Sequence, residues 1–158
     1  MKKIAFAAIG AASTLFATPA MAKSFSYEVT WEPVESIGGI TGMDGSQSAG
    51  GGIVNGTYVA TFDDGSVVNG TVRCVGMRQP SNSLFAIHMS CTAKDDQGTY
   101  SLIDGCNFLG KPGPETPLGC AGGMQAKDGE NAGARGGLTM HWYSDEKSTG
   151  TGQWYTAG

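Results

Sequence analysis

Basic residues and histidine are scarce in this 158-residue chain. It carries 10 Lys and Arg residues against 14 Asp and Glu residues, with 2 histidines and a formal net charge of −4. No segment concentrates positive charge. The sequence therefore lacks the basic patch with which proteins bind nucleic acids or anionic membrane surfaces, and this argues against both classes of partner.

The short motifs of common catalytic and metal sites are also missing. No Cys-x-x-Cys pair, zinc-ligand spacing, phosphate-binding glycine loop or nucleophile elbow occurs in the sequence. No segment combines helical spacing of apolar residues with caps at both ends. We therefore expect a chain without helices, with no cofactor, no metal site and no catalytic residue.

Long apolar runs are absent except at the start of the chain. Two lysines precede the apolar run Ile4–Phe16, and Ala20-Met21-Ala22 has the small-x-small pattern of a cleavage site. This order predicts a cleaved signal peptide over residues 1–22, because a retained anchor needs about 18 or more apolar residues. The mature chain, residues 23–158, would be one exported domain in the periplasm or outside the cell.

Removal of the signal peptide makes the chain more acidic. The loss of 2 lysines from the 10 basic residues leaves 8 against 14 acidic ones, a net charge of −6. After cleavage, no remaining segment is apolar enough to cross a membrane as a helix.

Alternating apolar and polar residues predict a series of short strands. In the first strand, Phe25, Tyr27, Val29 and Trp31 share one face. Similar patterns predict further strands, over residues 56–62, 67–76, 85–91, 99–103, 137–143 and 151–156, with a weak one starting near residue 124. We expect an all-β fold, a small antiparallel barrel of about eight strands, with a sandwich of two sheets as the alternative.

Two glycine-rich segments interrupt this pattern. Residues 36–52 are mostly Gly, Ser and small polar residues, and residues 104–134 contain three prolines among many glycines. Such segments carry too little apolar surface to order themselves against a core. We therefore expect both to be loops.

The four cysteines lie in the exported part of the chain. An even number of cysteines in an oxidising compartment indicates two disulfides, for which three pairings are possible. A turn at residues 79–83 would place Cys74 opposite Cys91 on the apolar face, at a Cβ spacing close to the disulfide range. We favour Cys74–Cys91 together with Cys106–Cys120, which closes a compact loop.

Groups that could bind metals have simpler explanations. The pairs Asp63-Asp64 and Asp95-Asp96 occupy predicted turns, where aspartate favours the turn itself. His88 and His141 each stand beside a methionine, but neighbours on a strand point to opposite faces and cannot bind one copper ion together. We therefore assign no metal to any of them.

The large side chains on the predicted strands indicate a cavity. In a closed barrel several of them would line the interior, where rings supply contact area and polar tips fix the orientation of a ligand. The candidate cavity residues are Tyr27, Tyr58, Met89, Trp142 and Trp154. The alternative is that these side chains only fill the core of a glycine-rich chain.

The segment DGENAGARGGLT, residues 128–139, carries glycines at positions 129, 133, 136 and 137. It resembles the Gly-Thr-Gly-x-aromatic-x-Gly-x-x-Gly turn of secreted bacterial proteins related to the allene oxide cyclase and dirigent barrels. Glu130 and Ala132 stand where that family has Thr and an aromatic residue. The resemblance covers the last third of the chain. It implies an eight-stranded antiparallel barrel with a central cavity, and it carries over no catalytic residue.

Three hypotheses for function follow. The first is an exported, non-catalytic barrel that binds a small apolar ligand or a protein partner. The second is a cyclase-like or isomerase-like enzyme, which requires polar groups that converge inside the cavity. The third is a surface or assembly subunit, which requires an unpaired strand edge.

Overall fold

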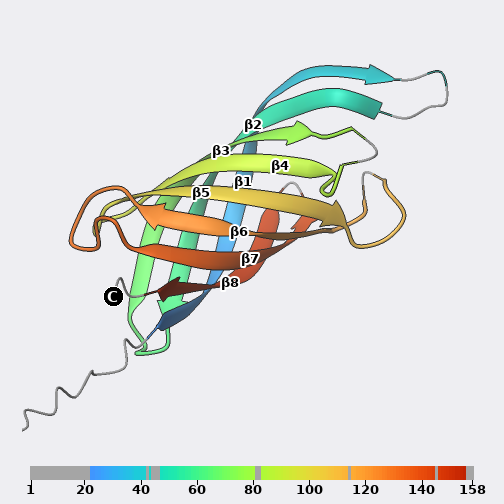
Figure 1. Cartoon of the computed structure of the whole chain (residues 1–158). Coiled ribbons are helices and arrows are strands. Elements are labelled where there is room, and N and C mark those ends of the chain that lie inside the picture. The colour runs from blue at the N-terminus through green and yellow to red at the C-terminus, as the bar shows by residue number, and fades with distance from the viewer. Residues whose placement is uncertain are drawn as a thin grey trace, which may run out of the picture.

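The chain folds into a closed antiparallel barrel. The computed structural model describes residues 22–41, 43, 47–80, 83–113, 115–144 and 146–155. In these ranges there are eight strands and no helix: β1 (Lys23–Thr41), β2 (Gln47–Phe62), β3 (Val67–Arg78), β4 (Ile87–Lys94), β5 (Thr99–Phe108), β6 (Leu118–Ala126), β7 (Arg135–Ser144) and β8 (Lys147–Tyr155). Each strand pairs with the next, and β8 pairs with β1 (Figure 1). The predicted eight-stranded barrel is confirmed, and the sandwich is not formed. All but the last residue of the predicted signal peptide lie outside the described part of the chain.

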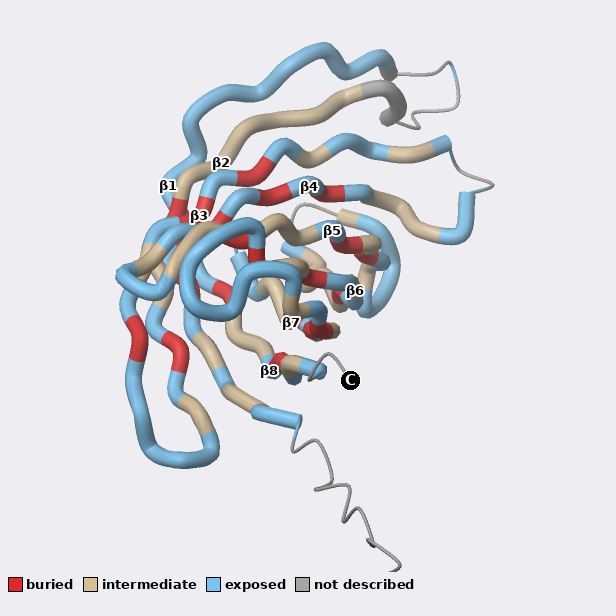
Figure 2. Tube along the Cα trace, turned by 60° about the vertical axis from the view of Figure 1, so that its left-hand side comes forward, coloured by how far each residue is buried: buried red, intermediate tan, exposed pale blue. Residues whose placement is uncertain are grey.

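Alternation along the strands separates the interior of the barrel from its surface. In β4, the buried side chains of Met89, Cys91 and Ala93 alternate with exposed ones. The same alternation appears as red and pale blue segments along β3 and β4 in Figure 2. Because successive side chains of a strand point to opposite faces, one parity in each strand fills the barrel and the other faces solvent.

Large interior side chains lie opposite glycines of the neighbouring strand. Trp31 pairs with Gly56 and Tyr58 with Gly70, and a Cβ at either glycine would overlap the facing ring. Four further pairs follow the same rule: Phe25 with Gly152, Tyr27 with Gly150, Met124 with Gly136, and Asp104 with Gly122. The absence of a side chain at these glycines makes room for bulky groups inside a narrow barrel.

Both predicted disulfides are present. Cys74–Cys91 joins β3 to β4, and Cys106–Cys120 joins β5 to β6. In each pair the cysteines are directly opposite one another, and their Cα atoms are 4.0 Å apart. This close approach is typical of cross-strand residues that do not share backbone hydrogen bonds, which lie ~4.5 Å apart. The disulfides indicate an oxidising environment.

The prediction that residues 36–52 form a loop is wrong for residues 36–41 and 47–52, which are strand, and residues 42 and 44–46 lie outside the described part of the chain. β1 and β2 stay paired from Glu35 with Ile53 to Thr41 with Gln47 (Figure 1). From Gly38 with Gly50 outward they form a two-stranded arm, because β2 pairs with β3 only from Gly51 on. Backbone pairing orders this arm without a core, which the composition could not reveal. Since β1 pairs with β8 only as far as Thr30, the outer edge of β1 beyond Trp31 has no strand beside it among the described residues. This edge is the feature that the third hypothesis requires.

The second predicted loop, residues 104–134, is partly strand. It contains the end of β5 and all of β6, so the connections shrink to residues 109–117 and 127–134. β6 reads LGCAGGMQA, and its small residues hide the alternation of buried Cys120, Met124 and Ala126. A strand held by partners on both sides does not need strong β propensity of its own.

Candidate functional site

A cavity of about 480 Å³ occupies one end of the barrel interior. Its outermost lining residues, such as Lys23, Phe62 and Gln97, lie where strands begin or end near the β2–β3 and β4–β5 turns. We call this end the mouth. The volume falls within the range of ~300–1,000 Å³ that is typical of pockets for small molecules.

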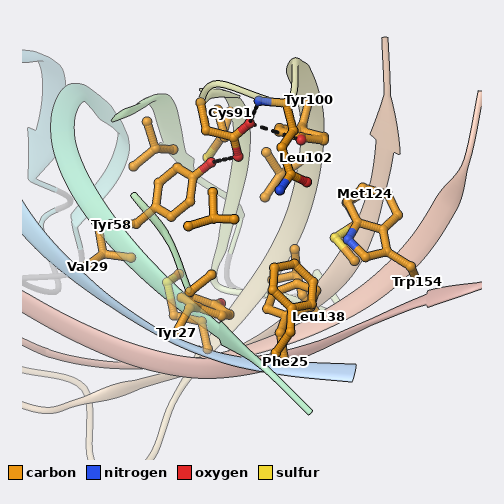
Figure 3. Close-up of a pocket in the computed structure, with 18 of the residues that line it drawn as sticks. Phe25, Tyr27, Val29, Tyr58, Cys91, Tyr100, Leu102, Met124, Leu138 and Trp154 are labelled. Atoms are coloured by element: carbon orange, nitrogen blue, oxygen red, sulfur yellow. Dashed lines mark hydrogen bonds between the residues drawn. The ribbon is translucent and has the colours of Figure 1, made fainter. Parts of the chain in front are cut away.

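Aromatic and aliphatic side chains form most of the cavity wall (Figure 3). The ring centroid of Phe25 lies 6.0 Å from that of Tyr27 and 5.2 Å from that of Phe62. The ring centroids of Tyr100 and Trp154 lie 5.6 Å apart. These rings give the cavity wall apolar surface with a few hydroxyl groups in it.

The opposite end of the barrel is packed. The Trp31 indole Nε1 donates a hydrogen bond of 2.8 Å to Oγ of Ser148, which is fully buried. The Trp31 ring stacks on Trp142, with centroids 4.6 Å apart and planes tilted by 7°. Met89 belongs to the same buried cluster, as does the Cys106–Cys120 disulfide. The cavity therefore ends at Trp31, which closes it at the end opposite the mouth.

The structure separates the five candidate cavity residues into two groups. Tyr27, Tyr58 and Trp154 line the cavity. Met89 and Trp142 also point into the barrel, but they pack in the closed end and are not part of the cavity wall. Alternation predicted the inward direction of Tyr27, Tyr58, Met89 and Trp142. The depth of each side chain along the barrel axis depends on strand register, which alternation does not give.

Asp95 organises the mouth. Its Oδ2 accepts a hydrogen bond of 2.6 Å from the Tyr58 hydroxyl, and its Oδ1 accepts one of 3.1 Å from the Tyr100 hydroxyl. The backbone N–H groups of Gln97 and Gly98 also donate to Oδ1. Burial and the neighbouring Asp95 carboxylate raise the pKa of both tyrosines, so they remain protonated donors. Asp95 thus not only forms the predicted turn but also accepts hydrogen bonds from two tyrosines of the cavity wall, which the sequence did not indicate.

Asp104 is the most distinctive polar group of the cavity. It is 3 % exposed, the only charged side chain that is buried in the described part of the chain, and it lines the cavity from β5. Its Oδ1 has no hydrogen-bond partner among the described residues. Burial raises its pKa to about 6. A carboxyl group in this setting can bind a donor or exchange a proton near neutral pH.

The charge of Asp104 acts on the hydroxyl group of Tyr27. The Tyr27 hydroxyl donates a hydrogen bond of 2.9 Å to the backbone carbonyl of Thr139. Burial raises the pKa of Tyr27, and the charge of Asp104 raises it further. The hydroxyl therefore stays protonated and is already committed to a backbone acceptor.

Sequence reasoning missed Asp104 because it fell in a segment that was expected to be a loop. A signal was present nonetheless. Tyr100, Leu102, Asp104 and Cys106 share one parity, which places the carboxyl group on the apolar face of a longer strand. Extending the strand predicted over residues 99–103 to include the cysteine would have identified an inward-pointing aspartate.

The described ranges contain no cluster of three or more His, Cys, Asp or Glu side chains that could hold a metal ion. Nor do they contain a helix with the length and hydropathy needed to cross a membrane. A comparison of the chain with protein-family models, with curated proteins and with solved structures finds no match.

Proposed function

We propose that this protein is an exported, non-catalytic barrel that binds a small, mainly apolar molecule in its interior. The observation that carries the proposal is the cavity of about 480 Å³, which is walled by aromatic and aliphatic side chains and ends at Trp31. The rings of Phe25, Tyr27 and Trp154 would cover the ligand. Burial of roughly 200 Å² of apolar ligand surface would contribute ~5 kcal/mol before the entropic cost of association.

Export is the second part of this proposal. Two buried disulfides suit an oxidising compartment, and the basic–apolar–Ala-x-Ala order at the start of the sequence suits a cleaved signal peptide. The periplasm or the extracellular space meets both conditions. The resemblance to allene oxide cyclase and dirigent barrels is in keeping with a secreted protein with a central cavity.

A matched pair of variants tests binding in the cavity. Ala93 lines the cavity from β4, and its neighbour Thr92 is exposed on the outer face. Residues 23–158 would be melted with and without a panel of apolar alcohols and aromatic compounds, and bound ligand should raise the melting temperature. Ala93→Phe should fill the cavity and abolish this rise, whereas Thr92→Phe should retain it. If no compound stabilises the wild-type protein, or if Ala93→Phe responds like the wild type, the proposal fails.

Asp104 favours a second candidate function, a cavity-based enzyme of the cyclase or isomerase type. A buried carboxyl group whose pKa is raised to about 6 is suited to acid–base catalysis at neutral pH. Any compound that binds would be recovered after incubation and compared by chromatography with the starting material. A product of equal mass and altered retention, lost in Asp104→Asn, would support catalysis. Recovery of unchanged compound would support binding alone.

A further inference from the structure

We propose that Asp104 recognises a protonated amine, so that the ligand is an apolar molecule with a cationic amino group at its deep end. This inference rests on the proposed function, since it assigns a chemical class to the molecule that enters the barrel. Asp104 is buried in the cavity wall, and its Oδ1 lacks a partner among the described residues.

The Asp104 carboxylate has no compensating group in the described structure. Its Oδ1 accepts no hydrogen bond, and no described Lys, Arg or His side chain forms an ion pair with it. A carboxylate in an apolar environment is strongly destabilised unless it is paired and hydrogen-bonded. The site therefore favours a guest that brings positive charge and N–H donors.

Four of the donors that line the cavity are committed to other acceptors. The Tyr27 hydroxyl donates to the carbonyl of Thr139, and the Trp31 indole donates to Ser148. The hydroxyl groups of Tyr58 and Tyr100 both donate to Asp95. None of these four groups satisfies Asp104.

Lys23 is the one cation among the residues that line the cavity, and it is engaged at the mouth. Its Nζ lies 3.1 Å from Oδ2 of Asp64 and 4.5 Å from the centre of the Phe62 ring. Lys23 pairs with Trp154 at the start of β1, while Tyr27 and Trp31 follow further into the barrel. The positive charge that Asp104 lacks is thus not supplied by the lining of its own cavity.

The surroundings of Asp104 suit an amine better than an alcohol. An alcohol could donate one hydrogen bond but would leave the negative charge uncompensated, whereas an ammonium group offers charge and several donors. Tyr27, on whose hydroxyl the charge of Asp104 acts, has an aromatic ring that can attract a cation. The apolar part of the ligand would then extend toward the mouth along Phe25 and Leu138, which also line the cavity.

Octylamine and octanol, which differ only in the head group, provide the direct test. Isothermal titration of residues 23–158 at neutral pH should show octylamine binding more tightly than octanol, by a factor on the order of tenfold to a hundredfold. Asp104→Asn should remove this difference while octanol binding persists. Asp96→Asn makes the same chemical change at an exposed position of the β4–β5 turn, and it should retain the preference for the amine.

A second measurement avoids dependence on the Asp104→Asn variant. Octylamine stays protonated at neutral and acidic pH, so its affinity for the wild type should fall as the pH is lowered through about 6, where Asp104 gains a proton. Octanol, which carries no charge, serves as the control for any effect of pH that does not act through the amine. The neighbouring elements present Met89, Gly122 and Tyr27 to Asp104, and the only titratable one, Tyr27, stays protonated in this range.

The outcomes separate the inference from the proposed function. Equal affinities for octylamine and octanol, or a preference that survives in Asp104→Asn or at low pH, would overturn the amine inference and leave apolar binding in place. Failure of both compounds to bind would overturn the inference. The proposed function fails only if the wider panel of apolar compounds also leaves the melting temperature unchanged.

Discussion

Gly122 stands directly opposite Asp104 in the β5–β6 ladder, and a Cβ at residue 122 would overlap the Asp104 carboxylate and the backbone oxygen of Ile103. The neighbouring Gly123 is on the outer face, where a Cβ would come no closer than 3.8 Å to the Gly136 carbonyl oxygen. Of these two adjacent glycines, only Gly123 has room for a side chain.

Gly122→Ala should therefore destabilise the fold, and Gly123→Ala should not. Relief of the overlap must displace Asp104 or the backbone of β5, which we expect to cost about 1–3 kcal/mol. Gly123→Ala should change the free energy of unfolding by less than about 0.5 kcal/mol. Urea denaturation of both variants measures the difference, and equal stabilities would contradict the placement of Gly122 inside the barrel.

Asp104→Asn should change how stability depends on pH. The folded-state pKa of Asp104 is about 6, above the ordinary 3.8, so the folded protein holds this proton more tightly than the unfolded chain does. The resulting stabilisation is fully present below pH 3.8 and is lost as the pH rises through about 6. The shift corresponds to roughly 3 kcal/mol at most.

The free energy of unfolding of Asp104→Asn, relative to wild type, should accordingly rise between about pH 4 and pH 7. Urea denaturation at several pH values provides the measurement, with Asp96→Asn as the control for loss of an exposed carboxylate. Parallel profiles for wild type and Asp104→Asn would show that Asp104 titrates normally.

Removal of either disulfide should lower the melting temperature clearly. The loop-entropy relation gives ~3 kcal/mol for a loop of about 15 residues, and the two bridges span 17 and 14 residues. We expect Cys74→Ala with Cys91→Ala, or Cys106→Ala with Cys120→Ala, to melt roughly 10 °C below the wild type. Calorimetry of both double variants checks this. An unchanged melting temperature for either double variant would contradict the claim that its disulfide stabilises the fold.

Trp142 and Trp154 should respond differently to truncation. Trp142 stacks on Trp31 in the packed end, so Trp142→Ala leaves a void and should cost ~3–5 kcal/mol. Trp154 lines the cavity and is partly buried, so Trp154→Ala should cost less stability and weaken ligand binding more. Urea denaturation and ligand titration of both variants test this. If Trp142→Ala weakened binding more than Trp154→Ala does, the ligand would bind at the packed end of the barrel and not in the cavity.

The β1–β2 arm should be dispensable for the barrel. Replacement of residues 37–51 by a two-residue Asn-Gly turn, which joins the paired residues Ser36 and Gly52, removes pairs that involve only β1 and β2, apart from Gly51 with Met77. Near-ultraviolet circular dichroism should still report the Trp31–Trp142 stack, and both disulfides should form. Loss of the tertiary signal would show that the arm supports the closed end.

The features that could be predicted from the sequence are those that depend on residues close together in the chain, such as alternation and turns. Alternation at Phe25 to Trp31 and at Ile87 to Cys91 marks strands by itself, and the 79–83 turn sets the register that brings Cys74 to Cys91. Asp104 and the arm were missed for a different reason. The strand around Asp104 is held extended by β4 and β6, and the arm is held by pairing between β1 and β2. In both cases the support comes from partner strands and not from the β propensity of the residues themselves.

Seven of the eight strand pairings join consecutive strands, and only β1 with β8 connects opposite ends of the sequence. This last pairing closes the longest loop, so it carries the largest entropic cost and depends on hairpins that are already in place. The wall of the cavity includes Phe25 and Tyr27 from β1 and Trp154 from β8. The cavity is therefore complete only once β8 has been made and has paired with β1.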